Sequence, residues 1–254
     1  SFYFSYSYDL TRSLQCQQTA KKDYSLIERA DPEYIWNWNM LSSFPNESIV
    51  NKYYKMPVIH GFIGTKECAV EPSCDSDAVL KTVELTIISR RSRFRVGRRY
   101  YMRGIDDDGN VANAVETEQI VMVGDNICSY VQARGSVPFY WSQVPNIKYK
   151  PKICIGRDES ANFERFSQHF KSLSKKYKKV QGISLVDMKG GEKELGDKYE
   201  EYINKLANPD ITLKRVDFHH MMKDITHLIN NMNGIYRDAN FGSFVLKKSV
   251  ISSE

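Results

Sequence analysis

An arginine-rich segment carries the side chains that are best suited to bind an anion. Seven arginines and no acidic residue lie between Arg90 and Arg103, and three aspartates follow at residues 106–108. Guanidinium groups bind phosphate through paired, charge-assisted hydrogen bonds, so arginines in a cleft would suit a multiply phosphorylated ligand. A solvated basic face would have the same composition, and the residue types alone leave both interpretations open.

Two acids follow the arginines at a spacing that places them on one face of a strand. Glu116 and Glu118 are two residues apart, and side chains alternate between the two faces of a strand. Nearby positive charge favours the carboxylate form, and an ionised carboxylate is a poor proton donor. We expect each acid to fix an arginine so that it points toward the cleft, rather than to act as a general base.

The first half of the chain has the alternating pattern of strands. Strands are predicted at residues 2–8, 58–63, 83–88, 120–123 and 127–131, the last two joined as a hairpin at residues 124–126. Short helices are predicted from Leu10, with Asp9 as N-cap, and from Pro32, with Asp31 as N-cap.

From about residue 158 the hydrophobic period lengthens to that of helices. Helices are predicted over residues 163–177, 195–206 and 222–232, and strands over residues 183–186, 211–218 and 241–246. This alternation predicts an α+β to α/β fold with a mixed, partly parallel sheet flanked by helices, preceded by the end of a β-rich N-terminal subdomain. In such sheets ligands bind beyond the carboxyl ends of the strands.

Composition indicates a globular chain with reduced thiols. Of the 254 residues, 41% are hydrophobic and 26% charged, and no apolar run approaches the roughly 18 to 20 residues that cross a bilayer. Five cysteines without a Cys-x-x-Cys pair favour the cytosol over a disulfide framework. The first residues lack an initiator methionine and a signal peptide, so we expect the chain to start within a longer protein.

Several blocks of sequence resemble the Sac-domain phosphoinositide phosphatases, and they occur in the same order along the chain as in that family. They include RFRVGR at residues 93–98 and further blocks at residues 2–5, 8–11, 103–106, 109–119 and 132–143. Residues 28–31, 57–63 and 145–151 are most similar to the family member of the endoplasmic reticulum and Golgi that hydrolyses phosphatidylinositol 4-phosphate. The resemblance covers nearly the whole chain and weakens after about residue 155.

The resemblance implies a domain division and a mechanism. Residues 1–55 would end the family's N-terminal subdomain, and residues 56–254 would form the first part of its catalytic subdomain. The family uses a Cys-x-x-x-x-x-Arg loop that binds phosphate with backbone amides and attacks phosphorus with its thiolate. That loop would follow the segment aligned with residues 236–253, so we expect no catalytic residue in this chain and no activity of the chain alone.

One stretch matches the spacing of that loop, from Cys128 to Arg134, and is predicted to be a strand instead. Its spacer contains bulky and β-branched residues and no glycine, and an extended strand cannot direct successive amides at one anion. His219 and His220 are adjacent and point apart, and residues 106–108 lack the spacing of a calcium loop. We expect neither a metal nor another cofactor.

The resemblance also implies a head-group site. Arg95, Arg103 and Arg134 are expected to line it, with Asn113, Glu116 and Glu118 as structural support. The expected partners are a phosphoinositide head group and the cytosolic surface of endoplasmic reticulum and Golgi membranes, with no nucleic acid. The alternative is a non-enzymatic basic module that binds acidic lipid or RNA through residues 90–103, and the family blocks count against it.

Overall fold

A computed structural model of the chain describes residues 1–18, 24–70, 81–98, 100–146, 151–217, 226, 229–230 and 244–247. The chain forms two compact units that interleave along the sequence. The unit that we call the sheet unit comprises Ser1–Arg93, Val115–Arg134 and Ser243–Glu254. The second, the helical unit, comprises Phe94–Ala114 and Gly135–Gly242.

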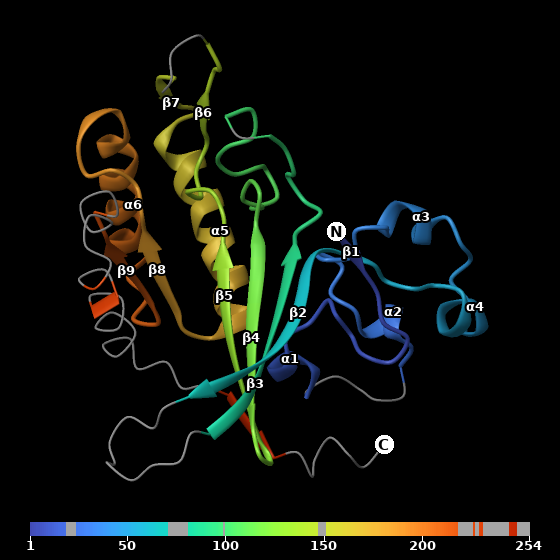
Figure 1. The fold of residues 1–254 in the computed structure, drawn as a ribbon. Coiled ribbons are helices and arrows are strands. Elements are labelled where there is room, and N and C mark those ends of the chain that lie inside the picture. Colours follow the sequence, from blue (N-terminus) through green and yellow to red (C-terminus); the bar gives the residue numbers. More distant parts are fainter. Residues whose placement is uncertain are drawn as a thin grey trace, which may run out of the picture. The chain divides into compact units, whose positions relative to one another are not determined.

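Within its described residues, the sheet unit contains six strands, each antiparallel to its neighbours, in the order β1-β2-β3-β4-β5-β10 (Figure 1). The strands are β1 (Phe2–Tyr3), β2 (Ile59–Val70), β3 (Lys81–Arg91), β4 (Val115–Val123), β5 (Asn126–Arg134) and β10 (Phe244–Lys247). A two-residue turn joins β4 to β5, because Val123 pairs with Asn126. Gly124 adopts a φ of 56° in this turn, a conformation that glycine reaches without strain.

Four short helices belong to the sheet unit: α1 (Leu14–Gln17), α2 (Leu26–Arg29), α3 (Trp38–Ser42) and α4 (Ser48–Tyr53). The core packs Leu10, Tyr34, Ile59 and Ile88 against one another. Side chains alternate between the two faces of the sheet, so the apolar ones gather on one face and pack into this core.

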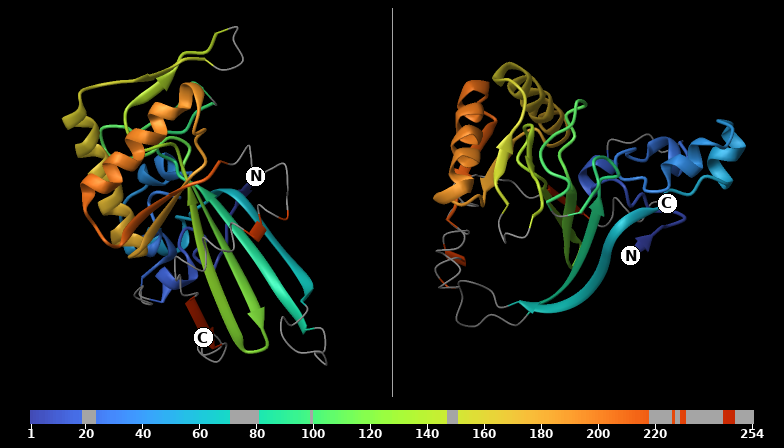
Figure 2. Two further views of the ribbon diagram at one scale, coloured as in Figure 1. Left: turned by 90° about the vertical axis from the view of Figure 1, so that its left-hand side faces the viewer. Right: turned by 90° about the horizontal axis from the view of Figure 1, so that it is seen from above.

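The helical unit is built around two helices that contact each other, α5 (Glu159–Tyr177) and α6 (Lys193–Leu206) (Figure 2). Its strands are β6 (Trp141–Gln143) paired antiparallel with β7 (Ile153–Ile155), and β8 (Val180–Ser184) paired parallel with β9 (Ile211–Arg215). A single-turn 3-10 helix, η1 (Gly190–Glu192), leads into α6. Phe139, Phe166, Phe170, Leu195 and Tyr202 form most of the core.

The mixed α+β class is confirmed, and its parallel part is small. Among the described residues, only β8 and β9 pair in parallel, on either side of α6. The last predicted strand forms as β10, but it pairs antiparallel with β5 rather than extending the β8–β9 pair. Most of the predicted helix at residues 222–232 lies outside the described residues.

The two helices predicted near the N-terminus are wrong in their starting points. Asp9 accepts hydrogen bonds from the backbone and hydroxyl of Thr11, and the helix begins later, at Leu14. Asp31 accepts from the backbone of Glu33 but caps only a turn, because the Trp36 N–H donates to the carbonyl of Val58 instead of continuing a helix. Both aspartates satisfy their own turns, a common alternative to helix capping.

No helix in the part of the chain that the structure describes is long and apolar enough to cross a membrane.

Candidate functional site

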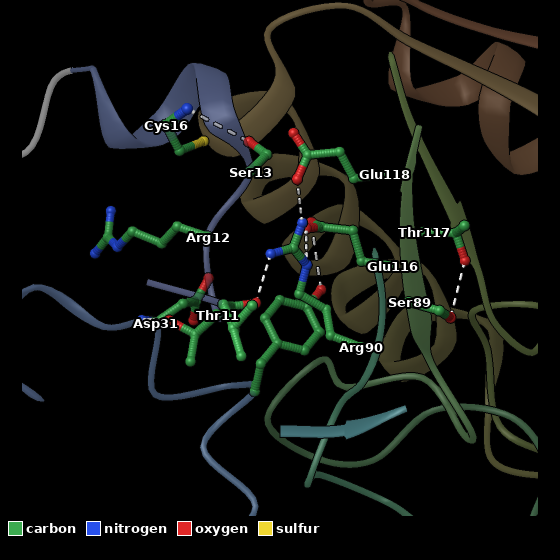
Figure 3. A network of polar contacts seen from close by, with 12 residues as sticks. Thr11, Arg12, Ser13, Cys16, Asp31, Ser89, Arg90, Glu116, Thr117 and Glu118 are labelled. Atoms are coloured by element: carbon green, nitrogen blue, oxygen red, sulfur yellow. Dashed lines mark hydrogen bonds and ion pairs between the residues drawn. The ribbon is translucent and has the colours of Figure 1, made fainter. Parts of the chain in front are cut away.

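A buried ion-pair cluster lies in the sheet unit (Figure 3). Arg90 on β3 pairs in register with Glu116 on β4, and Glu118 lies two residues further along the same strand. The Arg90 Nε atom is 2.8 Å from Glu116 Oε1, and its Nη2 atom is 2.6 Å from Glu118 Oε2. The three side chains are at most 1% exposed. We call these residues the Arg90 cluster.

Hydrogen bonds to the N-terminal segment and to β5 enclose this cluster. Arg90 Nη1 donates to the carbonyl of Leu10 at 2.7 Å. Glu118 Oε1 accepts from the backbone of Leu14 at 2.7 Å and from Ser129 Oγ at 2.6 Å. Buried charges are tolerated only when paired and hydrogen-bonded in this way, so the cluster fastens the N-terminal segment to β3, β4 and β5.

The charges in the cluster keep Arg90 protonated. Burial lowers the pKa of Arg90. The charges of Glu116 and Glu118 raise this pKa by more than burial lowers it, so the net shift is upward. Burial, together with the charge of Glu118, raises the pKa of the neighbouring Tyr8 to about 12. A guanidinium that is fully enclosed cannot reach a ligand, so the Arg90 side chain is closed to substrate.

A second group of arginines lies in the helical unit, in the segment that we call the arginine loop, residues 94–104. Arg95 Nη2 donates to the carbonyl of Arg103 at 2.7 Å. Asn113 secures this loop from both sides, because its N–H donates to the carbonyl of Arg95 and its Oδ1 accepts from the N–H of Gly97. Arg95 and Asn113 adopt positive φ angles of 44° and 54°, and strained backbone of this kind often marks functional sites.

Arg103 is held by aromatic rings. Its guanidinium carbon lies 5.3 Å from the ring centroid of Tyr100 and 5.2 Å from that of Trp141. The next residue, Gly104, has a φ of 68° and donates its N–H to Ser136 Oγ. A side chain at Gly104 would meet the carbonyl oxygen of Phe139 at 2.5 Å, so the position requires glycine. Cation–π contacts of this kind orient the guanidinium group.

The predicted site residues fall in both units. Arg95, Arg103 and Asn113 form one hydrogen-bonded loop. Arg134 is exposed at the end of β5, in the sheet unit. Glu116 and Glu118 pair with an arginine as predicted, but that arginine is Arg90, which faces the interior.

The sequence prediction missed the role of Arg90 and the supports of Arg103. Arg90 follows the buried Ile88 by two residues, so the strand period could have placed it on the inner face beside the two acids. Trp141 and Ser136 lie in the same resembling block, but no local pattern indicated their contact with the arginine loop.

The stretch from Cys128 to Arg134 is a strand, as predicted. It lies within β5 and pairs residue by residue with β4 from Val121 to Val115, so its amides do not converge on one point. Among the residues described by the structure, no three His, Cys, Asp or Glu side chains come close enough to share a metal ion.

Comparisons with known proteins place the chain in a family. The model of the SacI homology domain matches residues 1–223. The chain is 42% identical over 221 residues to phosphatidylinositol-3-phosphatase SAC1-A of Danio rerio. The aligned region covers 86% of this chain and 36% of that relative. The chain is 37% identical over 239 residues to phosphatidylinositide phosphatase SAC2 of the same fish, with 86% and 21% covered.

A yeast relative gives the same result. Phosphatidylinositol-3-phosphatase SAC1 of Saccharomyces cerevisiae is 36% identical over 231 residues, which is 87% of this chain and 35% of the relative. The chain thus spans about a third of the length of these SAC1 proteins and about a fifth of SAC2. The matched region contains both the Arg90 cluster and the arginine loop, and the chain belongs to the SacI homology domain family.

Proposed function

We propose that this protein is a cysteine-based phosphoinositide phosphatase. The observation that carries the proposal is the family match over residues 1–223, together with relatives that are named as phosphatidylinositol phosphatases. In the proposed reaction a thiolate attacks phosphorus and displaces the inositol oxygen, which takes a proton. Water then hydrolyses the phosphocysteine, releasing inorganic phosphate and regenerating the thiol.

Cys128 is not the proposed nucleophile. It lies in a paired strand, where the backbone amides cannot wrap a phosphate. We propose that the reactive cysteine belongs to a loop outside these 254 residues, and that the chain alone releases no phosphate.

The proposed substrate is a phosphatidylinositol monophosphate, in particular the 4-phosphate. Sequence blocks at residues 28–31, 57–63 and 145–151 support the 4-phosphate. The names of two relatives instead specify 3-phosphatases. The two isomers carry the same charge and differ in the position of the phosphate, so direct assays of both decide between them.

The proposed head-group site uses Arg95, Arg103 and Arg134. Asn113 supports it by fixing the arginine loop, and Glu116 and Glu118 support it by fixing β3 against β4. We place the substrate at the cytosolic face of endoplasmic reticulum and Golgi membranes. We also retain the division into residues 1–55 of an N-terminal subdomain and residues 56–254 of a catalytic subdomain as a proposal.

The test measures phosphate release by the full-length protein from vesicles that contain the 4-phosphate, the 3-phosphate or unphosphorylated phosphatidylinositol. We expect release from a monophosphate, fastest from the 4-phosphate, and unchanged release after Cys128→Ser. Faster release from the 3-phosphate would overturn only the positional assignment. Vesicle binding without any release would indicate a binding module and contradict the enzyme proposal, and loss of activity in Cys128→Ser would contradict the assignment of the nucleophile.

A further inference from the structure

The exposed side of α5 carries an unusual concentration of positive charge. From Arg165 to residue 186 the chain has six lysines and arginines and no aspartate or glutamate. Lys171 and Lys175 are four residues apart and lie on one face of the helix, and Lys178, its C-cap, and Lys179 follow directly after its last residue, Tyr177. All four are exposed. We call them the lysine face.

The opposite side of α5 is fixed in the core. Phe166 and Phe170 are at most 2% exposed and pack against Tyr202 and other residues of the helical unit. The direction of the lysine face is therefore set by packing, and the lysines cannot turn inward without unfolding the helix.

Two of the three lysines of α6 have a carboxylate partner among the described residues, unlike those of the lysine face. On α6, Lys193 forms an ion pair with Asp197, and Lys205 lies 3.3 Å from Glu159. In the part of the chain that the structure describes, no carboxylate forms an ion pair with a residue of the lysine face. Helix-dipole stabilisation accounts for cations in the last turn but not for Lys171, nearly two turns before the end of α5, or for Lys179 beyond it.

The lysine face also has a recess. A groove of about 410 Å³ on α5 is lined by Lys171, Lys175, Gln168, Ser172 and Glu164. The single acid at its edge is already paired with Arg165, at 2.9 Å. The positive charge of the groove thus remains available to an external anion.

We propose that the lysine face is a docking surface for an anionic lipid bilayer, separate from the head-group site. Lysine is a flexible point charge that suits a diffuse layer of lipid phosphates, whereas geometric recognition of one phosphate favours arginine. Single-stranded RNA would additionally need exposed aromatic rings for base stacking, and the rings of α5 are buried (Phe166, Phe170) or half-buried (Phe163, Tyr177). The choice of a membrane rests in part on the proposed function, since relatives are named for lipid substrates.

The test uses the full-length protein and vesicles that contain no phosphoinositide, so that its result does not depend on the head-group site. Phosphatidylcholine vesicles are compared with vesicles that also contain phosphatidylserine, at low and at high salt. We expect binding only with phosphatidylserine, and weakening by salt. Changing Lys171, Lys175, Lys178 and Lys179 to Gln should lower vesicle affinity by roughly 100-fold or more.

A charge-matched control separates this surface from overall charge. The control changes four exposed lysines elsewhere to Gln: Lys66, Lys152, Lys189 and Lys214. It should bind vesicles within about threefold of the unchanged protein, and thermal unfolding should show that both variants are folded. Equal losses in the two variants, no binding to phosphatidylserine vesicles, or tighter binding to single-stranded RNA than to vesicles would each overturn the proposal.

Discussion

The Arg90 cluster and the arginine loop hold the same side chain in opposite ways. In the sheet unit, the Arg90 guanidinium is buried between two carboxylates and a carbonyl. In the helical unit, Arg95 donates to a backbone carbonyl and Arg103 lies against two rings. The Arg90 guanidinium is thus closed to any ligand, whereas the side chains of Arg95 and Arg103 are partly exposed.

The largest expected effect comes from removing Arg90. Arg90→Met would leave two buried carboxylates without their cation, and breaking a buried pair in this way costs about 3–5 kcal/mol. The loss should appear in urea unfolding of the full-length protein. Lys66→Met, on exposed β2 of the same sheet, is the matched control and should change stability by less than about 0.5 kcal/mol. A loss below about 1 kcal/mol for Arg90→Met would show that the cluster is not structurally important.

The two acids should differ in their contributions. Glu118→Gln is expected to cost about 3 kcal/mol, because one amide oxygen cannot satisfy Arg90, Leu14 and Ser129 together. Glu116→Gln should cost about 1 kcal/mol, since Glu116 has a close ion pair with Arg90 and only a long contact, 3.5 Å, with the hydroxyl of Tyr34. Phosphate release should fall only in proportion to folded protein. An unchanged melting temperature with turnover reduced by a hundredfold or more would point to direct catalysis.

A pH effect is expected in the helical unit. His169 Nδ1 lies 3.1 Å from the carbonyl of Gly109, and burial lowers the pKa of His169 to about 4. The unfolded state therefore binds the proton more tightly, so stability is fully present above about pH 6.5 and decreases as pH falls toward 4. Because part of the residue remains accessible to water, the loss should be at most ~3 kcal/mol.

His169→Gln provides the comparison for this effect. Urea unfolding at pH 7 and pH 4.5 should show a clearly smaller decrease in the variant than in the unchanged protein. If both lose the same stability, another group controls the pH dependence.

The smallest expected effect on stability, and the one specific to activity, comes from the arginine loop. Arg103→Ala and Arg95→Ala should lower turnover on phosphoinositide vesicles by roughly 10- to 100-fold, corresponding to one or two lost charge-assisted contacts. Melting temperatures should change little. Arg98→Ala, exposed in the same loop, should stay within about twofold. Normal kinetics in both Arg95→Ala and Arg103→Ala would remove these residues from the proposed site.

The regular spacing of hydrophobic residues made most helices and strands predictable from the sequence. The phenylalanines of α5 recur at helical spacing, and the helix forms over Glu159–Tyr177 with Asp158 as N-cap. The hairpin of β4 and β5 also forms where expected. The predictions at Asp9 and Asp31 fail because turns compete there with helix caps. The strand predicted at residues 2–8 forms only over Phe2–Tyr3, and the short elements α2, α4, β6 and β7 were not predicted.

Contacts distant in sequence were less predictable. The Leu10 carbonyl accepts a hydrogen bond from Arg90, and the Leu14 N–H donates one to Glu118. Both leucines lie about 80 residues before Arg90, and nothing in the sequence near Arg90 indicates these contacts. The same holds for Trp141 and Arg103, because a cation–π contact requires no sequence pattern.

The pairing of β10 with β5 has a consequence for synthesis of the chain. The ribosome has synthesised all of β5 once it reaches Arg134, but the partner strand β10 begins only at Phe244. About 110 residues must therefore be added between the two strands. At about 5–20 residues per second, ribosomes leave this strand without its neighbour for roughly 5 to 20 seconds. An unpaired strand edge is a template for association with other chains. Nascent chains stalled between these two strands should therefore aggregate more readily, or bind chaperones more persistently, than chains that have passed residue 247.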